Sequence, residues 1–269
     1  MKLITNILSP FMLIWNYRTR ILNGVNQDVR QRYANSIFGI SWAVIYPFLQ
    51  LSIYAALYAL VFRIRPSGLT EMGYVVLVFS GLTPLLAFGE ILNAATGSLV
   101  GSRALLLNTV FPADLIPVRA GISAHITGLM ALCITLILSF SLGYGNWKVI
   151  LLVPVFWILL FMFAMGLGWI LSLVSLFARD IQHSLGLIIM TMFFLSPFAY
   201  TPEMVPEGLR IIIYLNPISY FVLVFQSLIA FGTLPDLIPV LGSVFFGLVT
   251  FLVGFLFFKR SKNAFFDYV

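Results

Sequence analysis

Apolar residues run through this chain in long blocks, and polar positions gather in short segments between them. A membrane-spanning helix needs about 20 mainly apolar residues to cross the hydrocarbon core. Six blocks approach or exceed this length, and the pattern predicts spans near 36–62, 73–98, 117–142, 150–177, 183–199 and 238–258. We therefore expect an all-α integral membrane protein that forms a single transmembrane domain over residues 1–269.

The N-terminal segment is too short and too polar to span a membrane. Ser9 and Pro10 fit an N-cap followed by proline at the first helical position. Apolar side chains then follow at helical spacing from Phe11 onwards. We expect an amphipathic helix over about 7–23 that lies on the membrane surface.

The stretch over 191–232 is too apolar for an ordinary loop and too often broken for a span. Prolines and charged residues interrupt its apolar runs: Pro197, Pro202, Glu203, Pro206, Glu207, Arg210 and Pro217. Non-helical backbone at membrane depth is tolerated only where protein or a water-filled cavity satisfies its polar groups. The pattern fits a segment that dips into the membrane and returns, and it also fits a long loop packed on the helix ends.

The connection over 101–119 is short and partly apolar, and Pro112 and Pro117 interrupt it. A brief helix that ends near Pro112 would lie across the membrane surface and dock to a soluble partner. A simple tight connection fits the same residues equally well.

Composition supports a polytopic membrane protein without a separable soluble domain. Hydrophobic residues make up 61% of the chain and charged residues 9%, with a mean hydropathy of +1.05. Soluble domains carry about 25% charged residues. The basic residues, which give a formal net charge of +6, are scattered over the flanks of the spans, so we expect no nucleic-acid binding.

The positions of lysine and arginine predict the orientation, because cytoplasmic loops carry an excess of both. With both termini inside, eleven of the 15 basic residues lie on the inner side. The outer side holds Arg63, Arg65, Lys148 and Arg210. Both termini are therefore predicted to be cytoplasmic, which places 191–232 on the outer face and 101–119 on the inner face.

Motifs for catalysis and metal binding are missing from the sequence. A phosphate-binding loop requires lysine between glycine and serine or threonine, and no lysine here follows a glycine. The two histidines, His125 and His183, have no cysteine or acidic cluster at metal-ligand spacing. We expect no catalytic residue, no metal site and no cofactor bound by this chain.

Glu90, with Asn93 close by, is the clearest ionisable residue within a predicted span. Ion-driven transporters keep such groups as relays, but a single carboxylate also fits a packing contact or a polar pathway, which we favour. Many secondary transporters contain inverted repeats, and Gly81–Pro84 is the only, weak counterpart of the broken stretch. We therefore expect the energy for transport to be supplied by another protein, and an ion-coupled secondary transporter is a distant alternative.

Aromatic residues recur at multiples of four along the first span. Each four-residue step advances about 40° around a helix, so the series forms a slow spiral in which Gln50 fills the one gap. Tyrosine and tryptophan can stack on sugar rings while their polar tips form hydrogen bonds, although membrane interfaces and helix packing also enrich aromatics. The candidate residues of a glycan path are Phe38, Trp42, Tyr46, Tyr54 and Tyr58.

Several segments, spread over nearly the whole chain, together resemble the permeases of ABC-2 type exporters for bacterial polysaccharides. Residues 28–33 with Ser36, Gly39, Trp42 and Pro47 are similar to the start of that family's first span. Residues 108–117 are similar to its coupling segment, 179–181 to the charged turn before its fifth span, and 196–197 and 216–220 to the edges of its outer re-entrant piece.

The resemblance implies a homodimer in the bacterial cytoplasmic membrane, bound to two cytoplasmic ATPase subunits that hold ATP and Mg. It implies lipid-linked glycans as substrates: O antigen, capsular polysaccharide or teichoic acid. It also implies that the N-terminal helix rests on membrane lipids near the entrance for the substrate. An ABC-2 exporter of small hydrophobic compounds or lipids shares the architecture and is the nearest alternative.

Two sets of site residues follow from the resemblance. It implies a coupling helix over about 101–112, with Arg103, Leu107, Asn108, Phe111 and Pro112 as residues that contact the ATPase. It implies short helices over about 200–232 that close the outer mouth, with Pro197, Tyr200, Glu203, Glu207, Asn216 and Pro217 as gate residues. Glu90 departs from the family pattern, in which we expect apolar and aromatic residues at this place.

Overall fold

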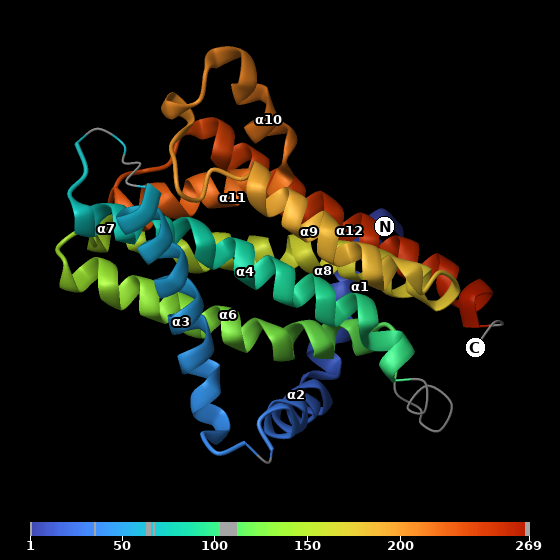
Figure 1. Cartoon of the computed structure of the whole chain (residues 1–269). Coiled ribbons are helices and arrows are strands. Elements are labelled where there is room, and N and C mark those ends of the chain that lie inside the picture. Colours follow the sequence, from blue (N-terminus) through green and yellow to red (C-terminus); the bar gives the residue numbers. More distant parts are fainter. Residues whose placement is uncertain (1, 35, 63–65, 67, 103–111, 267–269) are drawn as a thin grey trace.

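The structure, a computed structural model, describes every residue except 1, 35, 63–65, 67, 103–111 and 267–269. The described residues form helices and turns, with no strand among them (Figure 1). The helices are α1 (Lys2–Asn16), α2 (Arg18–Arg32), α3 (Trp42–Ala56), α4 (Glu71–Gly101), α6 (Leu115–Ser141), α7 (Trp147–Ile150), α8 (Val153–Phe177), α9 (Asp180–Leu195), α10 (Arg210–Leu215), α11 (Pro217–Phe225) and α12 (Leu237–Phe266). Short 3-10 or π turns add η1 (Gly39–Ser41), η2 (Leu57–Phe62), η3 (Pro202–Met204), η4 (Glu207–Leu209) and η5 (Gln226–Ala230).

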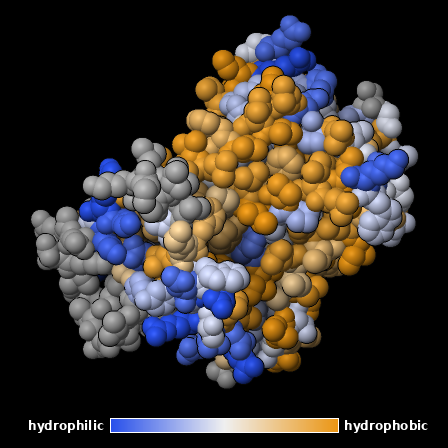
Figure 2. Space-filling model, turned by 180° about the vertical axis from the view of Figure 1, so that it is seen from behind, coloured by the Kyte–Doolittle hydropathy of each residue, from blue (hydrophilic) through white to orange (hydrophobic). Residues whose placement is uncertain are grey.

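Five helical segments of the described chain are long and apolar enough to cross a membrane: Gly39–Val61, Glu71–Gly101, Leu115–Ser141, Trp147–Phe177 and Leu237–Lys262. The expected all-α integral membrane fold is confirmed. Figure 2 shows apolar residues over a broad band in the middle of the molecule and hydrophilic residues gathered toward its ends. We call the end that carries α2 and residues 101–102 the α2 end, and the opposite end the α10 end.

The fifth expected span, over 183–199, differs from the structure. Helix α9 has 16 residues and ends at Leu195, so at 1.5 Å per residue it is about 24 Å long. The hydrocarbon core is roughly 30 Å thick. Residues 196–199 are non-helical, because Pro197 cannot donate the next helical hydrogen bond. All four residues are buried.

The N-terminal prediction is wrong in its boundaries. A first helix, α1, begins at Lys2 and passes through Pro10, and a second, α2, follows after a break at Tyr17. Inside a helix, proline removes one hydrogen bond and its ring crowds the carbonyl four residues earlier. Helix α1 nevertheless continues through Pro10, so Pro10 does not mark the start. The weak repeat signal at Gly81–Pro84 also lies inside one continuous helix, α4.

The centre of the bundle is α4, which packs against α6 on one side and α8 on the other, and α12 packs on α8. The helix axes approach closely at glycines. A Cβ on Gly254 would overlap the Gly166 carbonyl, and a Cβ on Gly128 would lie 2.7 Å from the Ala87 Cβ. Small residues at such contacts are the usual means by which membrane helices gain van der Waals contact.

Two ion pairs fasten the peripheral elements to this bundle. Asp28 of α2 accepts hydrogen bonds from Arg119 of α6, one of them from Nε at 2.8 Å, and Ser123 Oγ donates to the same carboxylate at 3.2 Å. Lys262 Nζ of α12 lies 2.7 Å from Asp114 Oδ2. The Nε1 of Trp169 in α8 donates to the Asp114 carbonyl at 2.9 Å, so residue 114 is held by both α8 and α12.

We predict that Gly254→Ala destabilises the protein. The added methyl group would force α12 away from α8, and overpacking of this kind costs about 1–3 kcal/mol. Gly97→Ala in α4 is the matched control, because a Cβ there meets no atom within 4 Å. Thermal unfolding in detergent should show a lower midpoint for Gly254→Ala and an unchanged or raised one for Gly97→Ala; equal midpoints would contradict the packing argument.

Candidate substrate path and outer gate

The chain between α9 and α12 is a compact arrangement of short helices. Turns η3 and η4 and helix α10 protrude from the bundle (Figure 1). The axis then turns by 101° between Glu207–Leu215 and Pro217–Ala230. The second arm, α11 with η5, is almost entirely buried. A bend this sharp is found in a broken span or in a re-entrant pair of helices. The prolines of this stretch favour both geometries.

Side chains satisfy the non-helical backbone at residues 196–199. Gln226 Nε2 donates to the carbonyls of Pro197 at 2.8 Å and Phe198 at 3.2 Å. Tyr74 Oη donates to the Ala199 carbonyl at 2.9 Å. Gln226 and Tyr74 are 2% and 0% exposed, so these carbonyls have protein donors at a place that bulk water does not reach.

The end of α9 is capped by the same neighbourhood. Asn216 Nδ2 donates to the Met192 carbonyl at 2.7 Å and to Ser196 Oγ at 2.9 Å. The last carbonyls of a helix have no partner within it, and Asn216 supplies one from 24 residues away in the chain. Gly81 of α4 allows the segment to approach, because a Cβ there would lie 2.6 Å from the Phe198 carbonyl oxygen.

The predicted gate residues separate into two groups. Pro197 and Asn216 are buried and belong to the backbone-satisfying contacts, and Pro217 begins α11. Glu203 and Glu207 are exposed on η3 and η4, and Tyr200 is partly buried between the groups. A cavity of about 260 Å³ lies beside η3, α10 and η5, and its walls include Glu203 and Asp236.

The aromatic series of the first span also divides in two. Phe38 and Trp42 form an edge-to-face pair with centroids 5.7 Å apart, and with Tyr46 they lie at the α2 end. Tyr58 packs edge-to-face on Phe198 at 5.3 Å, and Tyr54 contacts Phe193 at 5.4 Å and Phe198 at 6.2 Å. Because those two tyrosines pack against Phe193 and Phe198, they support the start of the broken stretch whether or not they also line a path.

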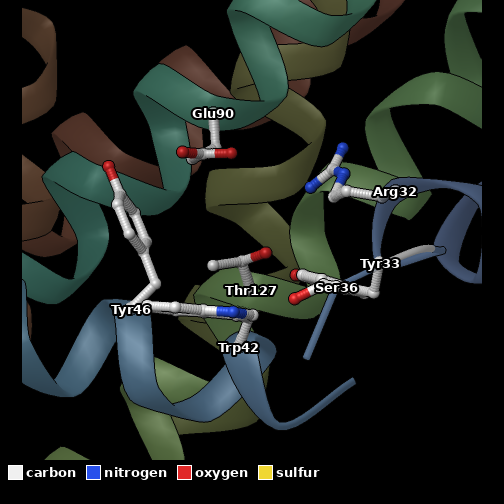
Figure 3. Close-up of a pocket in the computed structure, with 7 residues that line it drawn as sticks. All are labelled: Arg32, Tyr33, Ser36, Trp42, Tyr46, Glu90 and Thr127. Carbon is white, nitrogen blue, oxygen red and sulfur yellow. The ribbon is translucent and has the colours of Figure 1, made fainter. Parts of the chain in front are cut away.

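A second cavity, of about 370 Å³, lies at the α2 end. Its lining residues come from four helices and the α2–α3 connection: Arg32, Tyr33, Ser36, Trp42, Tyr46, Glu90 and Thr127 (Figure 3). Two of the five predicted path residues, Trp42 and Tyr46, therefore meet Glu90, although they are at least 44 positions apart in the chain. The lining combines aromatic rings, hydroxyl groups, one carboxylate and one guanidinium group.

The predicted ATPase-coupling residues Arg103, Leu107, Asn108 and Phe111 lie outside the described residues. Pro112, the fifth of them, is described and partly buried. The Leu115 amide donates to the Pro112 carbonyl at 3.0 Å. The connection thus returns directly into α6 next to Asp114.

Sequence reasoning missed the carbonyl partners Tyr74 and Gln226 and the cavity residues Arg32 and Thr127. Gln226 carried a usable signal, because an amide inside a long apolar run needs a buried partner. Arg32 and Thr127 carried none, since their convergence depends on how α2 and α6 pack.

Comparison with known proteins places the chain among membrane transporters. Residues 21–230 match the family described as ABC-2 type transporter. The chain is 31% identical over 247 residues to the O-antigen export system permease protein RfbA of Klebsiella pneumoniae, which covers 89% of this chain and 91% of that protein. It is 23% identical over 256 residues to the protein of that name in Myxococcus xanthus, with 94% and 96% covered. It is 21% identical over 239 residues to the polysialic acid transport protein KpsM of Escherichia coli, with 88% and 92% covered.

We predict that Gln226→Leu destabilises the broken stretch that begins at residue 196. The substitution keeps an apolar side chain of similar size but leaves the carbonyls of Pro197 and Phe198 without a donor, which costs about 1–3 kcal/mol. Ser227→Ala is the control, because the Ser227 hydroxyl donates only to the Leu223 carbonyl of its own helix. Thermal unfolding and limited proteolysis within 201–209 should distinguish the two, and a Gln226→Leu protein as stable and resistant as Ser227→Ala would disprove the assignment.

Proposed function

Because the chain belongs to the ABC-2 type transporter family, we propose that it is the permease subunit of an ATP-driven exporter of lipid-linked polysaccharide. The observation that carries this proposal is the similarity, over nearly the full length, to permeases named for O-antigen export and polysialic acid transport. The fold agrees with a multi-pass membrane protein, and the sequence contains no phosphate-binding loop with which the chain could hydrolyse ATP.

The energy source is then a separate cytoplasmic ATPase subunit that binds ATP and Mg. The excess of basic residues near the α2 end supports a cytoplasmic position for that end. We assign docking of the ATPase to 101–112. The contacts of Asp114 with Trp169 and Lys262 support this assignment, because a push on the docking segment would be transmitted to α8 and α12.

A second copy of the chain completes the translocation path. Only 17% of the residues in the apolar window of the first span are buried, against 83% of those in α4. Helix α9, which contacts α3 through Tyr54 and Phe193, is too short to span alone and exposes Leu187, Ile188, Met190, Phe194 and Leu195. We assign α3 and α9 to the homodimer interface, so that the aromatic residues of two first spans would border one channel.

In this mechanism the glycan moves outward along the channel while its lipid anchor stays in the bilayer. Trp42 and Tyr46 provide stacking surfaces near the cytoplasmic end. Tyr54 and Tyr58 support the outer segment, which opens to release the glycan. Several weak sites suit a long polymer, because a single tight site would hold it.

We predict that the purified complex contains a P-loop ATPase at equal stoichiometry, and that deletion of the gene abolishes surface polysaccharide while lipid-linked glycan accumulates inside the cell. Purification in mild detergent with mass spectrometry, and staining of surface and intracellular glycan, check the two parts. A control ABC complex, purified alongside, shows that the detergent preserves such assemblies. Recovery of the chain without an ATPase would contradict the exporter. Loss of lipid or drug export with normal surface glycan would indicate the ABC-2 exporter of small hydrophobic compounds instead.

We predict that Ile188→Cys in a Cys133→Ser background forms a disulfide-linked dimer under mild oxidation in membranes. Cys133 is the only native cysteine, so this background removes other thiols. Val253→Cys is the control, because Val253 is similarly exposed but lies on α12, which packs mainly on α8 and α11. Dimer bands on denaturing gels for Ile188→Cys alone support the interface, whereas bands for both variants or for Val253→Cys alone contradict it.

A further inference from the structure

We propose that the cavity around Glu90 is a binding site for an uncharged, hydroxyl-rich sugar unit, and that Glu90 is a specificity-determining residue within it. This inference rests on the proposed function, because it assigns a substrate-binding role to residues of a polysaccharide permease. It adds to the aromatic path a polar site that discriminates between sugars by their charge.

The cavity is a site assembled from distant parts of the chain. In Figure 3, Glu90 reaches in from α4, Thr127 from α6 and Arg32 from α2, while Trp42 and Tyr46 of α3 form the opposite wall. Its volume of about 370 Å³ falls within the range of roughly 300–1,000 Å³ typical of small-molecule sites. The ion pair between Asp28 and Arg119 holds α2 against α6, and Arg32 extends from the last residue of α2.

The charged groups of the cavity are not neutralised by direct contacts within the protein. Among the described residues, neither Glu90 nor Arg32 forms a hydrogen bond or an ion pair within 4.0 Å. Glu90 is partly buried, whereas Arg32 is exposed and acts on Glu90 through space without a direct contact. Partial burial of a carboxylate without a direct hydrogen-bond partner is costly. The other two carboxylates of the described chain that are not exposed, Asp28 and Asp114, do have basic partners, Arg119 and Lys262. Glu90 is therefore available to bind an external ligand.

The combination of one carboxylate and one guanidinium group selects the chemistry of that ligand. A carboxylate only accepts hydrogen bonds and a guanidinium group only donates them, whereas a hydroxyl group does both. A sugar can therefore satisfy both groups at once. A phosphate or a sugar acid would be attracted by Arg32 but repelled by Glu90, and an amine would be attracted by Glu90 but repelled by Arg32, so neither kind of charge is favoured by both groups.

The aromatic wall favours a sugar over water alone. The rings of Trp42 and Tyr46 offer an apolar face with polar tips, which suits the alternating C–H and O–H groups of a pyranose. The hydroxyls of Tyr33, Ser36 and Thr127 add groups that can donate or accept. These features match a neutral sugar more closely than a single ion.

The test places a photoreactive benzoylphenylalanine at Tyr46 in cells that make the strain's own polysaccharide. After irradiation, the tagged chain is purified and probed with antiserum against that purified polysaccharide. Val253, which is exposed on α12 and lies outside the cavity, is the control position. We expect a glycan adduct at position 46 and none at 253. An adduct with phospholipid in place of glycan would overturn the sugar assignment, because a zwitterionic headgroup could also bridge Glu90 and Arg32.

The role of Glu90 is tested in the same assay with Glu90→Ala and Glu90→Gln. We expect Glu90→Ala to reduce both the adduct and export by roughly tenfold or more, because a hydrogen bond to a charged group is lost. Glu90→Gln, which keeps the shape, should fall between this variant and wild type. Asn93→Ala is the matched control, because Asn93 lies one turn away on α4 and is exposed outside the cavity. Chain abundance and thermal stability are measured for each variant, and Glu90→Gln is decisive if Glu90→Ala does not accumulate.

The two hypotheses fail in different ways. If deletion of the gene abolishes surface polysaccharide but both Glu90 variants form adducts and export at wild-type levels, the inference is wrong and the proposed function stands. If the deletion strain retains normal surface polysaccharide, the proposed function is wrong and this inference falls with it.

Discussion

The α10 end of this structure depends on one constraint: the carbonyl groups of the non-helical residues 196–199 must be satisfied without water. In an apolar setting an unpaired carbonyl is costly, so the chain can leave its helix at Leu195 only where donors are already in place. Gln226 of η5 and Tyr74 of α4 donate to the carbonyls of residues 197–199, and Asn216, which lies between α10 and α11, donates to the Met192 carbonyl at the end of α9. The short α9, the sharp bend before α11 and the close contact at Gly81 are all consequences of bringing those donors to one place.

Much of the fold could be predicted because the membrane imposes a simple rule on the sequence. Long apolar blocks must be helices, and all five long spans lie close to the blocks that predict them. The ends were harder to place. Pro10 looked like a helix start and lies within α1, while Pro197 does end the helical part of its block. A helix can end at a proline inside the protein only where donors from other parts of the fold satisfy the freed carbonyl groups. Because these donors are distant in sequence, the residue type alone does not predict where a helix ends.

The candidate site was predictable only in part for the same reason. Spacing identified Trp42, Tyr46, Tyr54 and Tyr58 as one series, but their partners divide them. Tyr54 and Tyr58 pack on Phe198, whereas Trp42 and Tyr46, near the α2 end, line a cavity together with Glu90. Glu90 itself was conspicuous as a carboxylate in an apolar block. Its surroundings were not, because Arg32 and Thr127 approach it only after α2 and α6 have packed together.

The distribution of close packing suggests which part of the bundle is rigid and which part can move. Helices α4, α6, α8 and α12 meet at glycines whose replacement would create clashes, and such contacts cannot slide without losing van der Waals contact. The first span has no comparable glycine contact among the described residues and is only 17% buried. Its N-terminal half borders the Glu90 cavity, and its C-terminal half packs on residues 193–198. If the α4–α8 core moves as one unit relative to α3, the Glu90 cavity and the segment over 193–198 change together, so in the proposed exporter this single relative motion is sufficient to couple the two ends of the path.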